Sequence, residues 1–147
     1  MSKYRSILGL ICCTLLAIVM VGCGGPAAVK PTYTPDRIAE IQGHTADLQQ
    51  LTERLPELQE LIQKEDFIFA RNFIHGPLGE MRILMGRIST DLLPKEQKAA
   101  RDLAKQIAND LVEIDQASAE NNYKVAVRYY GETVKDVESF YKLIPQG

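Results

Sequence analysis

One histidine and two acidic residues share a face of a predicted helix near the start of the charged part of the chain. Glu40, His44 and Asp47 stand at positions i−4, i and i+3, which a helix brings to one side. Imidazole and carboxylate groups are ligands that Zn²⁺ accepts, but a single helix makes a poor cage, so another ligand must come from elsewhere. The favoured interpretation is therefore a histidine at the end of a bundle, hydrogen-bonded to Glu40 or Asp47. The alternative is opportunistic zinc binding by Glu40, His44 and Asp47.

Cys23 is the second residue with a chemical role to consider. Residues 1–22 have the parts of an export signal, with two cations followed by the uncharged apolar run 7–21. That run has 15 residues, fewer than the roughly 20 of a membrane-spanning helix. Residues 20–23, Met-Val-Gly-Cys, resemble a bacterial lipobox, in which the cysteine is acylated on sulfur and becomes the first residue of the mature chain. We therefore predict a lipoprotein signal peptide over residues 1–22 and lipidation of Cys23.

The stretch that follows Cys23 has the composition of a linker. Residues 23–35 hold two glycines and three prolines and have no helical periodicity, so we predict a lipidated flexible tether there and a folded domain over residues 36–147. Acyl chains on Cys23 would anchor that domain to a membrane. The alternative is an ordinary secreted protein in which Cys23 merely follows the signal.

The sequence lacks the motifs of the common catalytic sites. It has no Cys-x-x-Cys-His, no Glu-x-x-His, no Gly-x-Ser-x-Gly and no His-Glu-x-x-His. With two histidines, and with Cys23 used for lipidation, candidates for nucleophilic catalysis are few, so an enzyme is not expected. The formal net charge of −2 falls to −4 once the two signal-peptide cations are removed, which argues against a nucleic-acid partner.

Four amphipathic segments must position these residues. From Asp36 onward apolar residues recur at spacings of three and four, and no stretch alternates with period two. The first predicted helix starts at Thr34 or at Pro35-Asp36 and ends near Lys64. The second covers residues 67–92, the third runs from Pro94 to near residues 117–122, and the fourth covers residues 123–144. Because the connections are short, neighbours in sequence must pack antiparallel. The predicted fold class is all-α, an up-down-up-down four-helix bundle.

Prolines and glycines divide the first two segments. Pro56 either kinks the first helix or starts a second short one, and the unbroken apolar phase favours a single kinked helix. A bend is predicted at Pro77, where His75 is expected to satisfy a carbonyl freed by the proline. Gly79 and Gly86 are seven residues apart, which predicts that a neighbouring helix approaches closely there.

The last segment carries two heptad rows and a row of cations. The apolar rows, which we expect in the core, are Tyr123, Tyr130, Val137 and Ile144, and Val127, Val134 and Tyr141. Tyr129 points away from Tyr130, and Arg128 and Lys135 lie on another face. Such a row is usually a solvated face, but a basic row on an acidic body suits an acidic partner. We therefore regard Arg128, Tyr129 and Lys135 as candidate partner-binding residues.

Three longer stretches resemble a known family. FIHGPLGEMR (73–82), RYYGETVKDVESFY (128–141) and LLPKEQKAARDLAKQIANDLVEID (92–115) are similar to the PsbQ family of extrinsic photosystem II subunits, in its cyanobacterial lipoprotein form. The resemblance covers roughly residues 36–145. The chain departs from the family in lacking a tryptophan early in the second helix, where Phe67 or Phe69 stands.

The resemblance implies a place and a role. It implies a lipid-anchored bundle on the lumenal side of the cellular thylakoid membrane, docked on photosystem II near the manganese-stabilising extrinsic protein and an inner antenna subunit. There it would stabilise the complex and support water oxidation without chemistry of its own and without a required cofactor. The alternative function is a generic exported helical lipoprotein that binds a metal or a small ligand.

Overall fold

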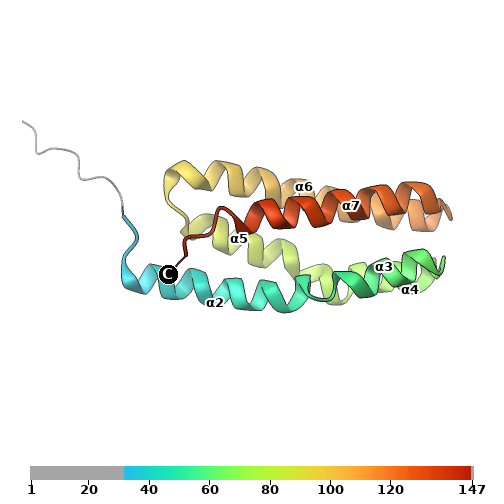
Figure 1. The fold of residues 1–147 in the computed structure, drawn as a ribbon, viewed down its shortest axis with the longest axis horizontal. Helices are drawn as coiled ribbons and strands as arrows, with labels where there is room; N and C mark the ends of the chain where they lie inside the picture. The colour runs from blue at the N-terminus through green and yellow to red at the C-terminus, as the bar shows by residue number, and fades with distance from the viewer. Residues whose placement is uncertain (1–31, 147) are drawn as a thin grey trace, which may run out of the picture. The chain divides into compact units, whose positions relative to one another are not determined.

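The computed structural model describes residues 32–146, which lie in one compact unit. The helices are α2 (Pro35–Thr52), α3 (Leu55–Gln63), α4 (Phe67–His75), the 3-10 helix η1 (Pro77–Glu80), α5 (Met81–Asp91), α6 (Pro94–Ala119) and α7 (Tyr123–Tyr141). They form four antiparallel limbs, namely α2–α3, α4–η1–α5, α6 and α7 (Figure 1). The prediction of an all-α four-helix bundle is confirmed.

Each limb packs on its neighbours in the order expected of an up-down-up-down bundle. The first limb contacts the second through α2 with α5 and α3 with α4, and α6 contacts α4, α5 and α7. Contacts between α3 and α7 close the bundle. Within residues 32–146 no helix combines the length and the apolar character needed to cross a bilayer. The predicted signal peptide, Cys23 and most of the predicted tether lie outside the described residues.

The first limb is broken rather than kinked. α2 ends at Thr52, and α3 starts at Leu55 with Pro56 in its first turn. The prediction of one continuous helix is therefore wrong, and the alternative of a second short helix is right. Because Pro56 has no N–H and its ring crowds the carbonyl four residues earlier, the helical ladder stops before it. Arg54, which precedes α3, pairs with Glu57 in the first turn of that helix at 2.9 Å.

The predicted bend in the second limb is confirmed. α4 ends at His75, and a short 3-10 turn leads from Pro77 into α5. The N–H of Gly76 donates to the carbonyl of Asn72 at 2.9 Å. A Cβ atom at position 76 would lie 2.9 Å from that same oxygen, so the bend requires glycine there.

Two helices at the same end of the bundle stop in the same way (Figure 1). Glu65 after α3 and Asn121 after α6 both have φ of 55°. In each case the N–H of the next residue donates back to a carbonyl near the helix end, from Asp66 to Leu61 at 2.9 Å and from Asn122 to Ala117 at 2.7 Å. Left-handed residues after a helix satisfy its last carbonyls, a position at which glycine is usual.

The core contains side chains from every limb, and its fully buried members include Ile41, Leu58, Met85, Ile107 and Phe140. The predicted core face of α7 is only partly right. Tyr123 and Val127 are 41% and 40% exposed, whereas small Ala126 and polar Thr133 are buried. Thr133 tolerates burial because its hydroxyl donates to the carbonyl of Tyr129 at 2.9 Å, inside its own helix.

Candidate functional site

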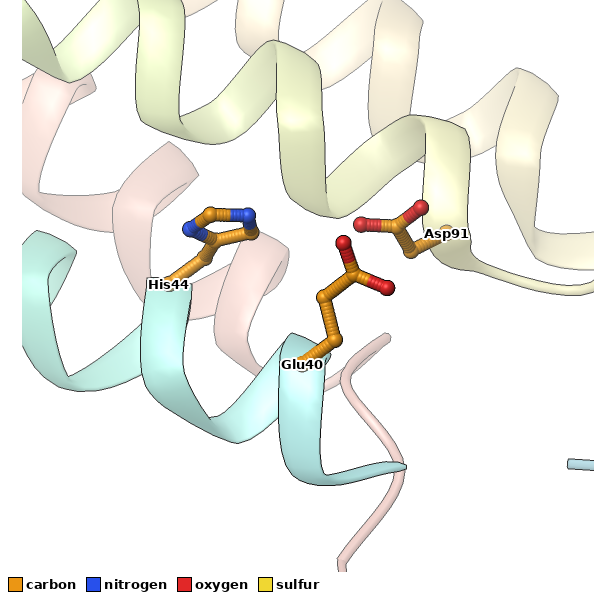
Figure 2. Close-up of side chains that lie close together, drawn as sticks. All are labelled: Glu40, His44 and Asp91. Atoms are coloured by element: carbon orange, nitrogen blue, oxygen red, sulfur yellow. The ribbon is translucent and has the colours of Figure 1, made fainter. Parts of the chain in front are cut away.

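Three side chains with metal-binding groups meet where the start of α2 lies against the end of α5. Glu40 and His44 are one turn apart on α2, and Asp91 is the last residue of α5. One ligand atom from each lies within 4.8 Å of the others. Figure 2 shows the two carboxylates pointing toward each other, with the imidazole beside them. Asp47, which the sequence grouped with Glu40 and His44, is not part of this cluster.

Hydrogen bonds fix the end of α5 on the first turn of α2. The guanidinium of Arg37 donates from Nε to the carbonyl of Asp91 and from Nη2 to the carbonyl of Thr90. Gln97 also donates to the carbonyl of Thr90, at 3.0 Å, and the hydroxyl of Tyr33 accepts from the backbone of the α5–α6 connection at 3.0 Å. These hydrogen bonds hold the backbone of residues 90 and 91 in place, and with it the start of the Asp91 side chain.

The cluster has the donor set of a divalent cation site. Ligands of one tetrahedral Zn²⁺ at 2.0–2.2 Å lie roughly 3.3–3.6 Å apart, so small side-chain rotations must draw these groups together. The cluster lines a pocket open to solvent, which leaves room for water as a fourth ligand. Arg87 lines the same pocket, and its charge opposes cation binding. Because α5 supplies Asp91, the cluster does not depend on a single helix.

A second polar group joins α4 to α6. Asp115 accepts from Arg71 Nε at 3.1 Å, and its same oxygen lies 3.0 Å from Nε2 of His75. The expectation that His75 satisfies a carbonyl near Pro77 is therefore wrong. The sequence signal that could have revealed this group is the i, i+4 pair of Arg71 and His75, which points both side chains toward one neighbouring helix.

Asp110 is a buried carboxylate on α6 with incomplete hydrogen bonding. Gln106 donates to its Oδ1 at 2.9 Å, and its Oδ2 has no partner among the described residues. Burial raises the pKa of Asp110, and the negative charges of Asp136, Glu132 and Glu113 raise it further, against the opposing effect of the hydrogen bond from Gln106. Its spacing of three and four residues from Ile107 and Ile114 places it on the apolar face of α6, but its charged side chain gave no reason to expect burial.

The candidate partner-binding residues lie on α7. Arg128 and Lys135 are exposed, as the sequence predicted for a basic row. The guanidinium carbon of Arg128 lies 4.3 Å from the centre of the Tyr129 ring, a cation–π contact. Tyr129 is half-buried and packs against the core, so its ring supports Arg128 more than it projects into solvent. Their role in partner binding stays a prediction.

Comparisons with known proteins agree with this architecture. The PsbQ family model, described as oxygen evolving enhancer protein 3, matches residues 2–145. A curated protein from Synechocystis sp. (strain PCC 6803), named CyanoQ, is 36% identical over 148 aligned residues, covering 99% of each chain.

Proposed function

This chain belongs to the PsbQ family, whose members are extrinsic subunits of photosystem II, and we propose that it is a non-catalytic lumenal subunit that stabilises the complex and supports water oxidation. The observation that carries the proposal is the likeness to CyanoQ, which extends over 99% of both chains at 36% identity. A likeness of that length includes all four limbs of the bundle, so it concerns the whole domain and not one motif.

The work of such a subunit is binding. A protein that binds only the assembled form of a complex stabilises that form by mass action. The stabilisation grows as the concentration of the protein rises above the dissociation constant. We propose that the binding partners are the inner antenna subunit of the photosystem II core and the manganese-stabilising extrinsic protein. Acylation of Cys23 would hold the domain at the thylakoid membrane, and the confinement would raise its effective concentration near the complex.

Purification from a photosynthetic host tests this function. An affinity-tagged chain should bring down photosystem II in mild detergent, and deletion of the gene should lower oxygen evolution per complex. A Cys23→Ser variant should lose the lipid label and show weaker recovery of the complex at equal expression. If the tagged wild-type chain never accompanies photosystem II, the proposed function is wrong.

A second candidate function is the binding of a divalent cation by Glu40, His44 and Asp91. The specific observation in its favour is that two helices far apart in sequence converge one imidazole and two carboxylates within 4.8 Å. Two protein ligands on one turn and a third from another helix form a more complete cage than α2 alone provides.

Calorimetric titration with Zn²⁺ separates the cluster seen in the structure from the trio read in the sequence. His44→Ala should abolish binding and Asp91→Asn should weaken it by about tenfold or more, because one of the anionic ligands is lost. Asp47→Asn removes the same charge from a residue of α2 outside the cluster, and should leave the affinity unchanged. A flat titration of the wild-type chain, or equal effects of the two asparagine variants, would exclude this site.

A further inference from the structure

An open groove runs between α5 and α6 on a face that no other limb of the bundle covers. It has a volume of about 800 Å³ and an apolar floor that includes Leu78, Met85 and Leu111. Val112 lines the groove while 62% of its surface is exposed. A large apolar side chain left this exposed at the edge of a groove suits contact with another molecule.

The walls of this groove are made of small residues. Gly79 and Gly86 line it from the second limb, and Ala104 and Ala108 line it from α6. The prediction that the two glycines admit a neighbouring helix of this domain is wrong. A Cβ atom at Gly86 would meet nothing within 4 Å, and one at Gly79 would reach only a carbonyl oxygen 4.0 Å away. Packing within the domain therefore does not explain a glycine inside α5, where alanine would favour the helix.

The rim of the groove is basic although the domain is acidic. Residues 32–146 contain 14 Lys and Arg, since three of the 17 precede residue 32, against 19 Asp and Glu. Arg82, Arg101 and Lys105 line the groove, and none of them takes part in an ion pair among the described residues. The acidic residue in the lining, Asp115, is already engaged by Arg71 and His75. The groove is thus a local concentration of positive charge.

We propose that this groove docks an acidic amphipathic helix of photosystem II. The inference rests on the proposed function and adds to it a docking face and the chemistry of the partner. Small walls let the backbone of a helix come close, the apolar floor receives its large side chains, and the cationic rim pairs with its acidic residues.

Charge and shape favour this occupant over two others. Two copies of this chain that met groove to groove would bring six cations together, which disfavours a symmetric dimer. An anionic membrane surface would meet the rim cations but would not fill a recessed apolar floor. A protein segment that carries both acidic and large apolar side chains can pair with the cations of the rim and also bury the apolar floor.

Charge reversal provides the first arm of the test. The full chain is expressed with an affinity tag in a photosynthetic host, and its ratio to photosystem II is measured after purification in mild detergent. Arg82→Glu combined with Arg101→Glu and Lys105→Glu should lower that ratio by at least about tenfold, because like charges would face each other. The matched control reverses three exposed cations outside the groove that also make no ion pair among the described residues, Lys95, Lys124 and Lys142, and should keep the ratio within about twofold of the wild type.

Filling the groove without a change of charge provides the second arm. Gly79→Leu adds a side chain at a position that lines the groove and does not line the pocket of the cation cluster, as Gly86 does, and it should lower recovery as strongly as charge reversal does. Gly43→Leu is the matched control, because Gly43 is an exposed glycine inside α2 with nothing within 4 Å of an added Cβ. Circular dichroism and thermal melts of each variant check that it remains folded.

The outcomes separate the groove from the proposed function. If the wild-type chain is absent from the complex, both proposals fall. If the wild-type chain and the groove variants are recovered with photosystem II in equal ratio, only the groove is excluded. If the ratio falls only for Arg128→Glu combined with Lys135→Glu, the docking face lies on α7 instead. A photoreactive residue at Val112 should cross-link to an acidic segment of a photosystem II subunit. Cross-linking to a second copy, or groove-dependent binding to phosphatidylglycerol vesicles without loss of recovery, would overturn the proposal.

Discussion

Replacing Asp110 with asparagine should make the bundle more stable at neutral pH. The residue is 1% exposed, and one of its carboxylate oxygens has no hydrogen-bond partner among residues 32–146. Glu132 and Asp136 on α7 and Glu113 on α6 add negative charge around it. Asparagine keeps the acceptor for Gln106 and removes the buried charge, so both the desolvation and the repulsion are relieved.

The size and the sign of the effect follow from burial. A buried polar group that lacks one hydrogen bond destabilises a fold by about 1–3 kcal/mol. Because the new amide also lacks a partner on one side, we expect a net gain of about 1 kcal/mol at pH 7–8. Burial raises the pKa of Asp110, so the folded chain keeps this proton to higher pH than the unfolded chain does. The contribution of Asp110 is thus most favourable at low pH and is lost as pH rises through the folded pKa.

Urea denaturation followed by circular dichroism measures this difference in free energy of unfolding. The advantage of Asp110→Asn should be larger at pH 7.5 than at pH 5 and should disappear near the unfolded pKa of about 3.9. The control is Asp47→Asn, an exposed aspartate on α2, which should change stability by less than about 0.5 kcal/mol. An Asp110→Asn chain that is less stable than wild type at pH 7.5, or whose advantage grows as pH falls, would refute the reasoning.

Two further predictions concern the backbone, and the same denaturation assay checks them. Gly76→Ala should destabilise the fold by about 1–3 kcal/mol, because the added Cβ would press on the carbonyl of Asn72. Gly131→Ala should stabilise the fold by up to about 1 kcal/mol, because Gly131 is exposed inside α7 and its Cβ would have nothing within 4 Å. Equal effects of the two variants would show that the contact with Asn72 does not matter. Glu65→Gly should raise the free energy of unfolding by about 1 kcal/mol, because Glu65 has a left-handed backbone that glycine adopts without strain, and Asn121→Gly should raise it less. A lower free energy of unfolding for Glu65→Gly would show that the contacts of the Glu65 side chain outweigh this backbone strain.

The architecture could be predicted because it depends on signals local in sequence. Apolar spacing of three and four fixed the number of limbs, and short connections fixed their order. The bend at Pro77 followed from chemistry that proline carries everywhere. The break before Pro56 was missed because the spacing of apolar residues continues unchanged across it. That spacing indicates which side of a helix faces the core, but it does not indicate whether the helix is continuous.

The candidate site was only half visible because it depends on distances between limbs. Glu40 and His44 share a helix, so their spacing revealed them, but Asp91 joins them through the alignment of α5 against α2. The buried face of α7 was misread where small Ala126 and hydrogen-bonded Thr133 replace large apolar side chains. The two glycines were read as packing residues, although they face open space, because sequence cannot say which side of a helix has a neighbour.

The hydrogen bonds at the start of α2 give the domain a mechanical clamp. Tyr33 and Arg37 hold the α5–α6 connection and the end of α5, and Gln42 donates to the carbonyl of Pro145 at 2.9 Å near the C-terminus. These bonds join α2 and the residues just before it to the end of α5, to the α5–α6 connection and to the C-terminal segment. A force applied to the residues before α2 would therefore pass into three other segments of the chain.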